Sequence, residues 1–254
     1  MKTANLDIVY CLKNSLNNEE LRYSLRSLVN LPHRNIWIIG GKPPKWVKNV
    51  YYLPFEQKEE SKWMNTRKML ELACNTPKIS TNFMWFNDDF FILRPIVDLQ
   101  YHTDRTLQER ALNTISPKTQ TFSKYGRRLM QEHTALEENG LTTRNFEVHC
   151  PMVYNKKKLL RVLEKYPTLV MPRSLYGNEY KLKAIDGKDY KIEDNHSKIS
   201  PEAPFASTSD LSFRNGEIGK QVRGLFTKPS EHEDVWAGLS TPPNFNRGQD
   251  LRFL

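Results

Sequence analysis

Two adjacent aspartates stand between two blocks of aromatic and apolar side chains. Asp88 and Asp89 belong to the run NFMWFNDDFF, residues 82–91. A buried carboxylate is costly unless a cation or a hydrogen-bond donor faces it. A hard divalent cation needs such oxygen ligands and leaves room for substrate phosphates. The pair therefore predicts a metal site, and a pair of turn carboxylates after a strand is the alternative.

The first hundred residues have the pattern of elements that would position these aspartates. β-branched and aromatic runs predict strands at 7–12, 35–41, 49–55 and 81–89, the last ending on the carboxylates. Amphipathic helices are expected over 19–31 and 60–75. Strands mixed with helices predict an α/β domain with a parallel-rich sheet. Ligands of such sheets bind beyond the carboxyl ends of the strands, where the aspartates are expected to lie.

The remainder of the chain has weaker patterns. Residues 101–145 have only weak helical periodicity and are interpreted as an acceptor-facing insertion. A basic helix is expected over 155–167, where a proline ends it. We expect a polar, exposed loop over 181–204 and a last strand over 205–213.

Composition and charge limit the class of protein. The 254 residues, 38% hydrophobic and 11% aromatic, suffice for one sizeable core. A net charge of +9 favours a polyanionic partner such as nucleic acid or an anionic glycan, with a merely basic protein as the alternative. Three separated cysteines argue against a disulfide framework and a zinc site. The chain has no apolar run of about 20 residues and no signal-peptide pattern at its start, so a cytoplasmic protein is expected.

Several motifs, in order along most of the chain, resemble the Stealth family of sugar-phosphate transferases and, more broadly, nucleotide-sugar transferases of the GT-A fold. They are NNEELRYSLRSL, IWIIGGKPPKW, FMWFNDDFFILRPI, HCPMVYNKKKLL and STSDLSF. The resemblance implies a GT-A-like, Rossmann-like mixed sheet flanked by helices in one domain, residues 1–254. Residues 1–100 would bind the nucleotide sugar and metal, and residues 101–254 would bind the acceptor.

The resemblance also implies a metal and its ligands. Asp89, supported by Asp88, would hold Mn or Mg, and the cation would offset charge on the leaving nucleoside diphosphate. Asn87 departs from the DxD spelling of many GT-A enzymes but supplies an equivalent oxygen. CLKNS replaces the family's usual opening sequence, which leaves open whether a sugar or a sugar phosphate is transferred.

Further residues are candidates for substrate contacts and proton transfer. The resemblance implies contacts with the donor, the acceptor or their phosphates for a set of residues: Lys13, Arg22, Asn65, Arg67, Arg173 and Asn178. A solvated helix face is the alternative for Arg22, and a simple β-turn for the run RSLYGNEY. His149 suits a general base because imidazole titrates near neutrality, and Asp210 suits the same role or a metal ligand. A hydrogen-bonded core histidine is the alternative for His149.

Three functions are compatible with these patterns. The first is metal-dependent transfer of a sugar from a nucleotide sugar, with UDP as the expected nucleotide, to a hydroxyl of a polyanion. That acceptor would be a hydroxymethylated DNA base or an anionic surface polymer. The second is Stealth-type transfer of a sugar 1-phosphate to a glycan hydroxyl. The third is a non-catalytic nucleic-acid-binding protein that uses the basic helix 155–165.

Overall fold

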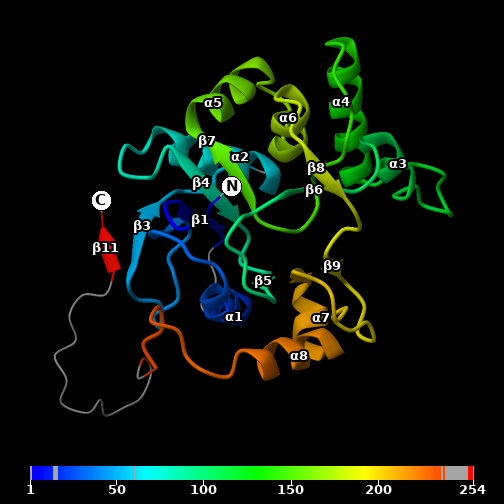
Figure 1. Ribbon diagram of the computed structural model, residues 1–254. Coiled ribbons are helices and arrows are strands. Elements are labelled where there is room, and N and C mark those ends of the chain that lie inside the picture. The colour runs from blue at the N-terminus through cyan, green and yellow to red at the C-terminus, as the bar shows by residue number, and fades with distance from the viewer. Residues whose placement is uncertain (1, 14–16, 60, 236, 238–250, 254) are drawn as a thin grey trace.

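A six-stranded sheet forms the centre of the computed structural model, which describes residues 2–13, 17–59, 61–235, 237 and 251–253 (Figure 1). The strand order is β11–β3–β2–β1–β4–β7. The bounds are β1 Asp7–Leu12, β2 Ile36–Gly40, β3 Val50–Pro54, β4 Asn82–Phe86, β7 Met152–Asn155 and β11 Leu251–Phe253. β7 is antiparallel to β4, whereas the other pairs in this sheet are parallel. The predicted α/β class with a central mixed sheet is confirmed.

Helices cover both faces of this sheet. Ile8 and Tyr10 of β1 pack toward α1 (Glu19–Ser27) and the 3₁₀ turn η1 (Leu28–Asn30). Val9 packs on the opposite side with α2 (Lys62–Asn75), α5 (Lys156–Lys165) and α6 (Pro172–Glu179). Figure 1 shows α5 and α1 on opposite sides of the sheet. Burial on both faces explains why the strands read as continuous apolar runs rather than alternating ones.

The chain reverses its direction of travel across the sheet at β1. From β1 it moves outward to β2 and β3, and then returns to the other side of β1 as β4. β1 and β4 are parallel, and Tyr10 pairs in register with Phe86, so their carboxyl ends lie at the same edge. A crevice at such a switch point is the usual ligand site of an open α/β sheet.

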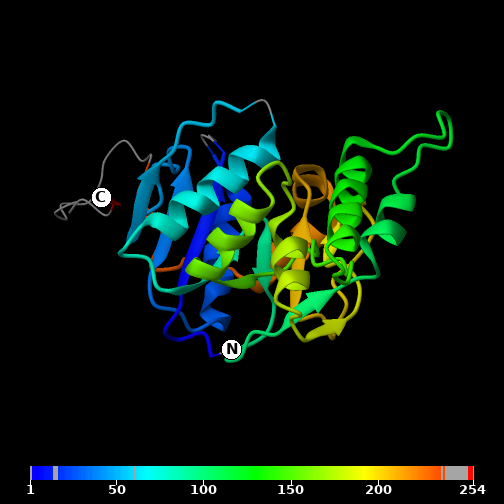
Figure 2. The same cartoon turned by 90° about the horizontal axis from the view of Figure 1, so that it is seen from above.

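Two smaller sheets and four further helices complete the described fold. β5 (Phe90–Ile92), β10 (Phe205–Thr208) and β9 (Lys191–Ile192) form one sheet, and β6 (Tyr101–Thr103) and β8 (Ala184–Asp186) form the other. The helices are α3 Leu107–Leu112, α4 Lys124–Glu138, α7 Asp210–Asn215 and α8 Glu217–Leu225. Figure 2 shows α3 and α4 together at the end of the molecule opposite β3. None of the helices in the described ranges has the length and apolar character needed to cross a bilayer.

Several expected elements have different bounds in the structure. β4 ends at Phe86, so the aspartates lie in the turn beyond the strand. The strand expected over 205–213 was wrong in its second half, because Ser209 and Ser212 form a reciprocal capping box that starts α7 at Asp210. RSLYGNEY forms most of α6 rather than a β-turn. The expected loop over 181–204 contains β8 and β9.

A buried carboxylate holds the amino end of the sheet. Asp7, fully buried at the start of β1, accepts bonds from Arg34 Nε and Nη2 at 2.7 Å each. Further donors are the backbone N–H of Asn35 at 3.1 Å, the Trp37 indole at 3.2 Å and the backbone N–H of Ser80 at 2.8 Å. Burial alone would raise the pKa of Asp7, but these donors and the Arg34 charge lower it below its ordinary value.

Candidate active site

A cleft of about 1360 Å³ lies at the carboxyl end of β4. Its walls come from the turn after β4, the first turn of α1, the region of α3, the segment 187–194 and the start of α7. Eight acidic side chains line it against five lysines and arginines, although the whole chain carries 38 basic and 29 acidic residues. The cleft therefore has the opposite charge balance from the protein as a whole.

Asp88 is tied to the start of α1. Asn18, the N-cap of that helix, accepts a hydrogen bond from the Leu21 backbone N–H at 2.9 Å and donates its Nδ2 to Asp88 Oδ2 at 2.5 Å. Burial raises the pKa of Asp88 to about 6, and the neighbouring Asp89 carboxylate adds to the rise. No ion pair joins Asp88 to a lysine or arginine in the described part of the chain.

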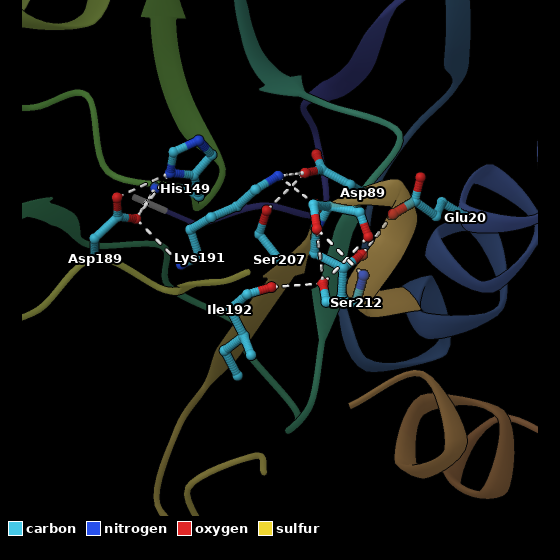
Figure 3. Close-up of polar contacts among 10 residues, drawn as sticks. Glu20, Asp89, His149, Asp189, Lys191, Ile192, Ser207 and Ser212 are labelled. Carbon is cyan, nitrogen blue, oxygen red and sulfur yellow. Dashed lines mark hydrogen bonds and ion pairs between the residues drawn. The ribbon is translucent and has the colours of Figure 1, made fainter. Parts of the chain in front are cut away.

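Asp89 has a resident cationic partner. Its Oδ2 accepts bonds from Lys191 Nζ at 2.5 Å and from Ser207 Oγ at 2.7 Å (Figure 3). The Lys191 ammonium also donates to the backbone carbonyl of Thr208. Only 11% of the Asp89 side chain and 17% of the Lys191 side chain are exposed, so water screens this pair weakly.

Two more carboxylates converge beside the aspartates. Glu20 lies in the first turn of α1 and accepts a bond from Thr208 Oγ1 at 2.6 Å, and Asp210 begins α7. Burial, together with the neighbouring Asp89, Asp88 and Asp210, raises the pKa of Glu20 to about 8 despite the bond from Thr208. We call Glu20, Asp88, Asp89 and Asp210 the carboxylate cluster. Like charges raise one another's pKa in this way when no cation compensates them fully.

The His149 ring bonds the carboxylate of Asp189, which lies 40 positions further along the chain. Its ring Nδ1 lies 2.8 Å from Asp189 Oδ1 and 3.0 Å from Oδ2, and its backbone N–H donates to the same carboxylate at 2.9 Å (Figure 3). Arg110 Nη2 donates to Asp189 Oδ2 at 3.0 Å. The histidine ring also packs edge-on against Phe90. His149 is thus part of the cleft wall, 30% exposed, with a charged partner behind it.

The structure brings only some of the predicted site residues to this cleft. Those lining it are Asp88, Asp89, His149 and Asp210. Lys13 lies on a smaller cavity of about 420 Å³, which Glu20, Asp88 and Asp210 also line. Three members of the carboxylate cluster therefore line two hollows of unequal size.

The other predicted substrate contacts have partners inside the fold. Arg67 donates to the carbonyls of Leu163, Tyr166 and Leu169, beyond or within the last turn of α5. Arg173 donates to the carbonyls of Val148 and Cys150, and its guanidinium lies over the Trp85 ring.

Three more of these residues also have intramolecular partners. Asn65 exchanges bonds with the Glu59 backbone, and Asn178 bonds the Arg144 backbone. Arg22 forms a 3.5 Å ion pair with Glu233 and lies over the Trp46 ring.

Sequence reasoning missed several residues of the cleft. Glu20 belongs to the helix expected over 19–31, and Asp189 and Lys191 belong to the polar loop expected over 181–204, with no site role predicted for any of them. A usable signal existed in KDYKI, residues 188–192, because side chains two apart in an extended segment point to the same side. In the structure Asp189 and Lys191 use this spacing to reach His149 and Asp89.

The donor atoms of the cluster fit a hard divalent cation. Carboxylate oxygens are the ligands that Mg²⁺ and Mn²⁺ prefer. Burial and then the neighbouring carboxylates raise the pKa values of Glu20 and Asp88, and a cation beside them would lower both values. Within the described ranges, no three His, Cys, Asp or Glu side chains already stand together at positions that could hold a metal. A cation held here would thus draw its remaining ligands from substrate or water.

Comparisons with known proteins give structural likeness alone. No protein-family model matches the chain, and no curated protein is similar in sequence. An active-site mutant of LgtC is 10% identical with a TM-score of 0.49, covering 92% of this chain and 99% of that one. A galactosyltransferase LgtC with donor and acceptor sugar analogues gives 10% identity and a TM-score of 0.46 over the same shares.

A third likeness is to the glycosyltransferase GlyE of Streptococcus pneumoniae. It is 9% identical with a TM-score of 0.34, covering 74% of this chain and 46% of that one.

Proposed function

We propose that the protein is a GT-A-like glycosyltransferase, which moves a sugar from a nucleotide sugar to an acceptor hydroxyl. The observation that supports this most is the carboxylate cluster, which lies where β1 and β4 end at the switch point of the sheet. The cleft of about 1360 Å³ exceeds the range of roughly 300–1000 Å³ usual for one small ligand, so a donor and an acceptor fit together.

The residues divide into two tasks. Asp88 and Asp89, with Glu20 beside them, would hold Mn or Mg, which when bound supplies positive charge for the two phosphates of the donor. His149 would take the proton of the acceptor hydroxyl as that oxygen forms its bond to the anomeric carbon. The bond from that carbon to the diphosphate oxygen breaks, and the electron pair leaves with the nucleoside diphosphate. Asp210 is the second candidate for the proton-accepting role.

The two halves of the chain contribute differently to this division. Glu20, Asp88 and Asp89 come from residues 1–100, and His149, Asp189, Lys191 and Asp210 come from residues 101–254. This supports a first half that binds the nucleotide sugar, with UDP as the proposed nucleotide, and a second half that meets the acceptor.

The proposed acceptor is a polyanion. Lys62, Arg105 and Lys188 are exposed and line the same cleft, where phosphate or carboxylate groups of the acceptor would find them. Arg105 also has a left-handed backbone, with φ of 61°. Because acidic residues outnumber basic ones along the cleft, the acceptor's charges would contact these three side chains rather than the carboxylate cluster. A hydroxymethylated DNA base and an anionic surface polymer are the two candidate acceptors.

Transfer of a sugar 1-phosphate, as in Stealth proteins, is the second candidate. The NDD turn and His149 belong to the motifs that resemble that family, and both line the same cleft. This observation favours the second candidate. The two reactions release different nucleotides. Glycosyl transfer liberates a nucleoside diphosphate, whereas sugar-phosphate transfer liberates a nucleoside monophosphate.

One chromatographic experiment tests the proposal. The protein is incubated with a panel of nucleotide sugars and with hydroxymethylated DNA or an anionic polymer, with Mn²⁺ and with chelator. The expected result is metal-dependent release of a nucleoside diphosphate together with a glycosylated acceptor. Release of nucleoside monophosphate would select the second candidate. Undiminished turnover in chelator would contradict the metal site.

A nucleic-acid-binding protein without catalysis has less support. It relies on the basic helix α5, but Lys156 of that helix is buried and donates to the backbone carbonyls of Thr76 and Ile79. Lys165 pairs with Glu179 at 3.0 Å. Strong, salt-dependent DNA binding without binding of any nucleotide sugar would revive this function.

A further inference from the structure

A full set of hydrogen-bond donors holds the carboxylate of Asp189 in place. Its oxygens accept bonds from the backbone N–H groups of His149 at 2.9 Å and Lys191 at 3.2 Å, and from Arg110 at 3.0 Å. The His149 ring completes the set at 2.8 Å. Burial alone would raise the pKa of Asp189, but the bonds and charges of His149 and Arg110 lower it to about 2. The carboxylate is therefore ionised at every pH at which the protein would act.

An ionised carboxylate determines where the imidazole carries its proton. It only accepts hydrogen bonds, so the nitrogen 2.8 Å away, Nδ1 of His149, must be a donor. A neutral imidazole has one N–H, and its other nitrogen, Nε2, is then an unprotonated acceptor. Figure 3 shows that other ring nitrogen on the side of the ring away from Asp189.

The surroundings also fix the orientation of the ring. Asp189 binds both the ring and the backbone N–H of His149, so the side chain and main chain are held by one carboxylate. Phe90 packs its ring against the imidazole at a centroid distance of 6.5 Å and an interplanar angle of 84°. Arg110 prevents Asp189 from swinging away, since it bonds the second carboxylate oxygen.

We propose that Asp189 is a positioning residue, which holds His149 as the Nδ1–H tautomer so that Nε2 is free to accept a proton in the cleft. This inference rests on the proposed function, because the proton would come from the acceptor hydroxyl. Arg110 assists by anchoring Asp189. The three residues come from the region of α3, the turn before β7 and the turn before β9, so the base depends on segments distant in sequence.

The direct test is the nitrogen NMR spectrum of the His149 ring, which needs no substrate. His149→Gln identifies its signals, and spectra are recorded above the midpoint of its own titration so that the ring is neutral. The wild type is expected to show a protonated Nδ1 and an unprotonated Nε2. A wild-type ring with the proton on Nε2 would overturn the proposal, and this result requires no variant of Asp189 to fold.

A matched pair of variants separates positioning from local packing. Asp189→Asn replaces one carboxylate oxygen by an N–H donor, which should shift the His149 proton toward Nε2. Asp194→Asn is the control, because Asp194 lines the same cleft but bonds the backbone N–H groups of His196 and Ser197. An unchanged tautomer in a folded Asp189→Asn protein would contradict the proposal.

Kinetics provides a second readout once a donor is known. Asp189→Asn should lower kcat by about 10²–10⁴-fold, as loss of an orienting carboxylate does in related acid–base pairs, while the donor KM stays unchanged. An unchanged kcat would overturn the role of Asp189. If no nucleotide sugar is turned over, the proposed function fails, and the spectrum still decides the tautomer.

Discussion

Two carboxylate sites at opposite ends of one sheet differ in how their charge is compensated. Asp7, at the amino end of β1, accepts bonds from an arginine, an indole and backbone N–H groups, and its pKa is lowered. Asp88, beyond the carboxyl end of β4, is bonded by an asparagine and faces other carboxylates, and its pKa is raised to about 6. The chain thus surrounds one buried carboxylate with donors and places the other beside further carboxylates.

The difference indicates which site serves stability and which serves function. A buried charge with a full set of donors stabilises the fold, whereas like charges held together destabilise it. Proteins retain such destabilising arrangements where a ligand will compensate them. We therefore assign a structural role to Asp7, and we propose a binding role for the cluster around Asp88.

The largest expected effect is on turnover. Asp89→Asn should lower metal-dependent transfer by about 10²–10³-fold, because the isosteric amide removes the charge that a cation needs. Asp186→Asn is the matched control, since Asp186 lies outside the cleft and bonds Thr103 and Arg144. The same loss of turnover in this control would contradict the proposed role of Asp89 as a metal ligand. The measurement is the initial rate of nucleotide release, with folding checked by thermal unfolding.

Asp7→Ala should have the largest effect on stability. It leaves the buried donors of Trp37, Asn35 and Ser80 without an acceptor, which we expect to lower the free energy of unfolding by about 3 kcal/mol. Denaturant unfolding at pH 7 measures the loss. The exposed Glu138→Ala should change it by less than about 0.5 kcal/mol.

The pH dependence of this loss provides a check. Because the pKa of Asp7 is lowered on folding, its contribution is present above the unfolded value of about 3.9 and is lost as the pH falls through the folded value. The wild type and Asp7→Ala should therefore converge in stability at acid pH. If the difference in free energy of unfolding between the two proteins grew as the pH fell, the charge of the Asp7 carboxylate would not be what stabilises the amino end of the sheet.

Lys191→Met should strengthen metal binding. Lys191 Nζ lies 2.5 Å from Asp89 Oδ2, so a divalent cation must share the Asp89 carboxylate with the Lys191 ammonium or displace it. Titration of the protein with Mn²⁺ alone should show roughly ten-fold tighter binding in the variant, about 1.4 kcal/mol. Lys188→Met is the control, since Lys188 lines the same cleft and forms no ion pair with any described residue. Equal or weaker Mn²⁺ binding by Lys191→Met would mean that the lysine is not a competitor.

Asp88→Asn should have the smallest effect, with a sign opposite to that at Asp7. Removing one charge from the cluster relieves repulsion from Asp89 and Glu20, and we expect the metal-free protein to gain about 1 kcal/mol in stability. A loss comparable to that of Asp7→Ala would remove the contrast between the two ends of the sheet.

The sequence alone predicts a feature when all the residues that determine it lie in one segment. The runs at β1, β2 and β3 are apolar because both faces of the sheet are covered, and their length and flanking turns identify them as strands. Asp88 and Asp89 follow the end of β4 after one residue, so their position at the sheet edge was predictable. The expected metal ligands therefore lie in the cleft.

The missed residues depend on contacts between distant segments. Lys191 and Asp89 are 102 positions apart, and a polar stretch gives no sign of which carboxylate it will meet. Arg67 and Arg173 are expected to contact substrate, yet both donate to backbone carbonyls that the fold buries. Such carbonyls appear only when helices and turns are packed, and the sequence alone does not reveal them.

Binding of a nucleotide sugar tests the central claim most directly. Thermal unfolding is measured with a panel of nucleotide sugars, with and without Mn²⁺, for the wild type and for Asp89→Asn. A bound donor raises the unfolding temperature by mass action. The expected result is a rise with at least one donor that requires Mn²⁺ and is absent in the variant. No rise with any donor, or an equal rise in chelator and in Asp89→Asn, would contradict the assignment of the carboxylate cluster.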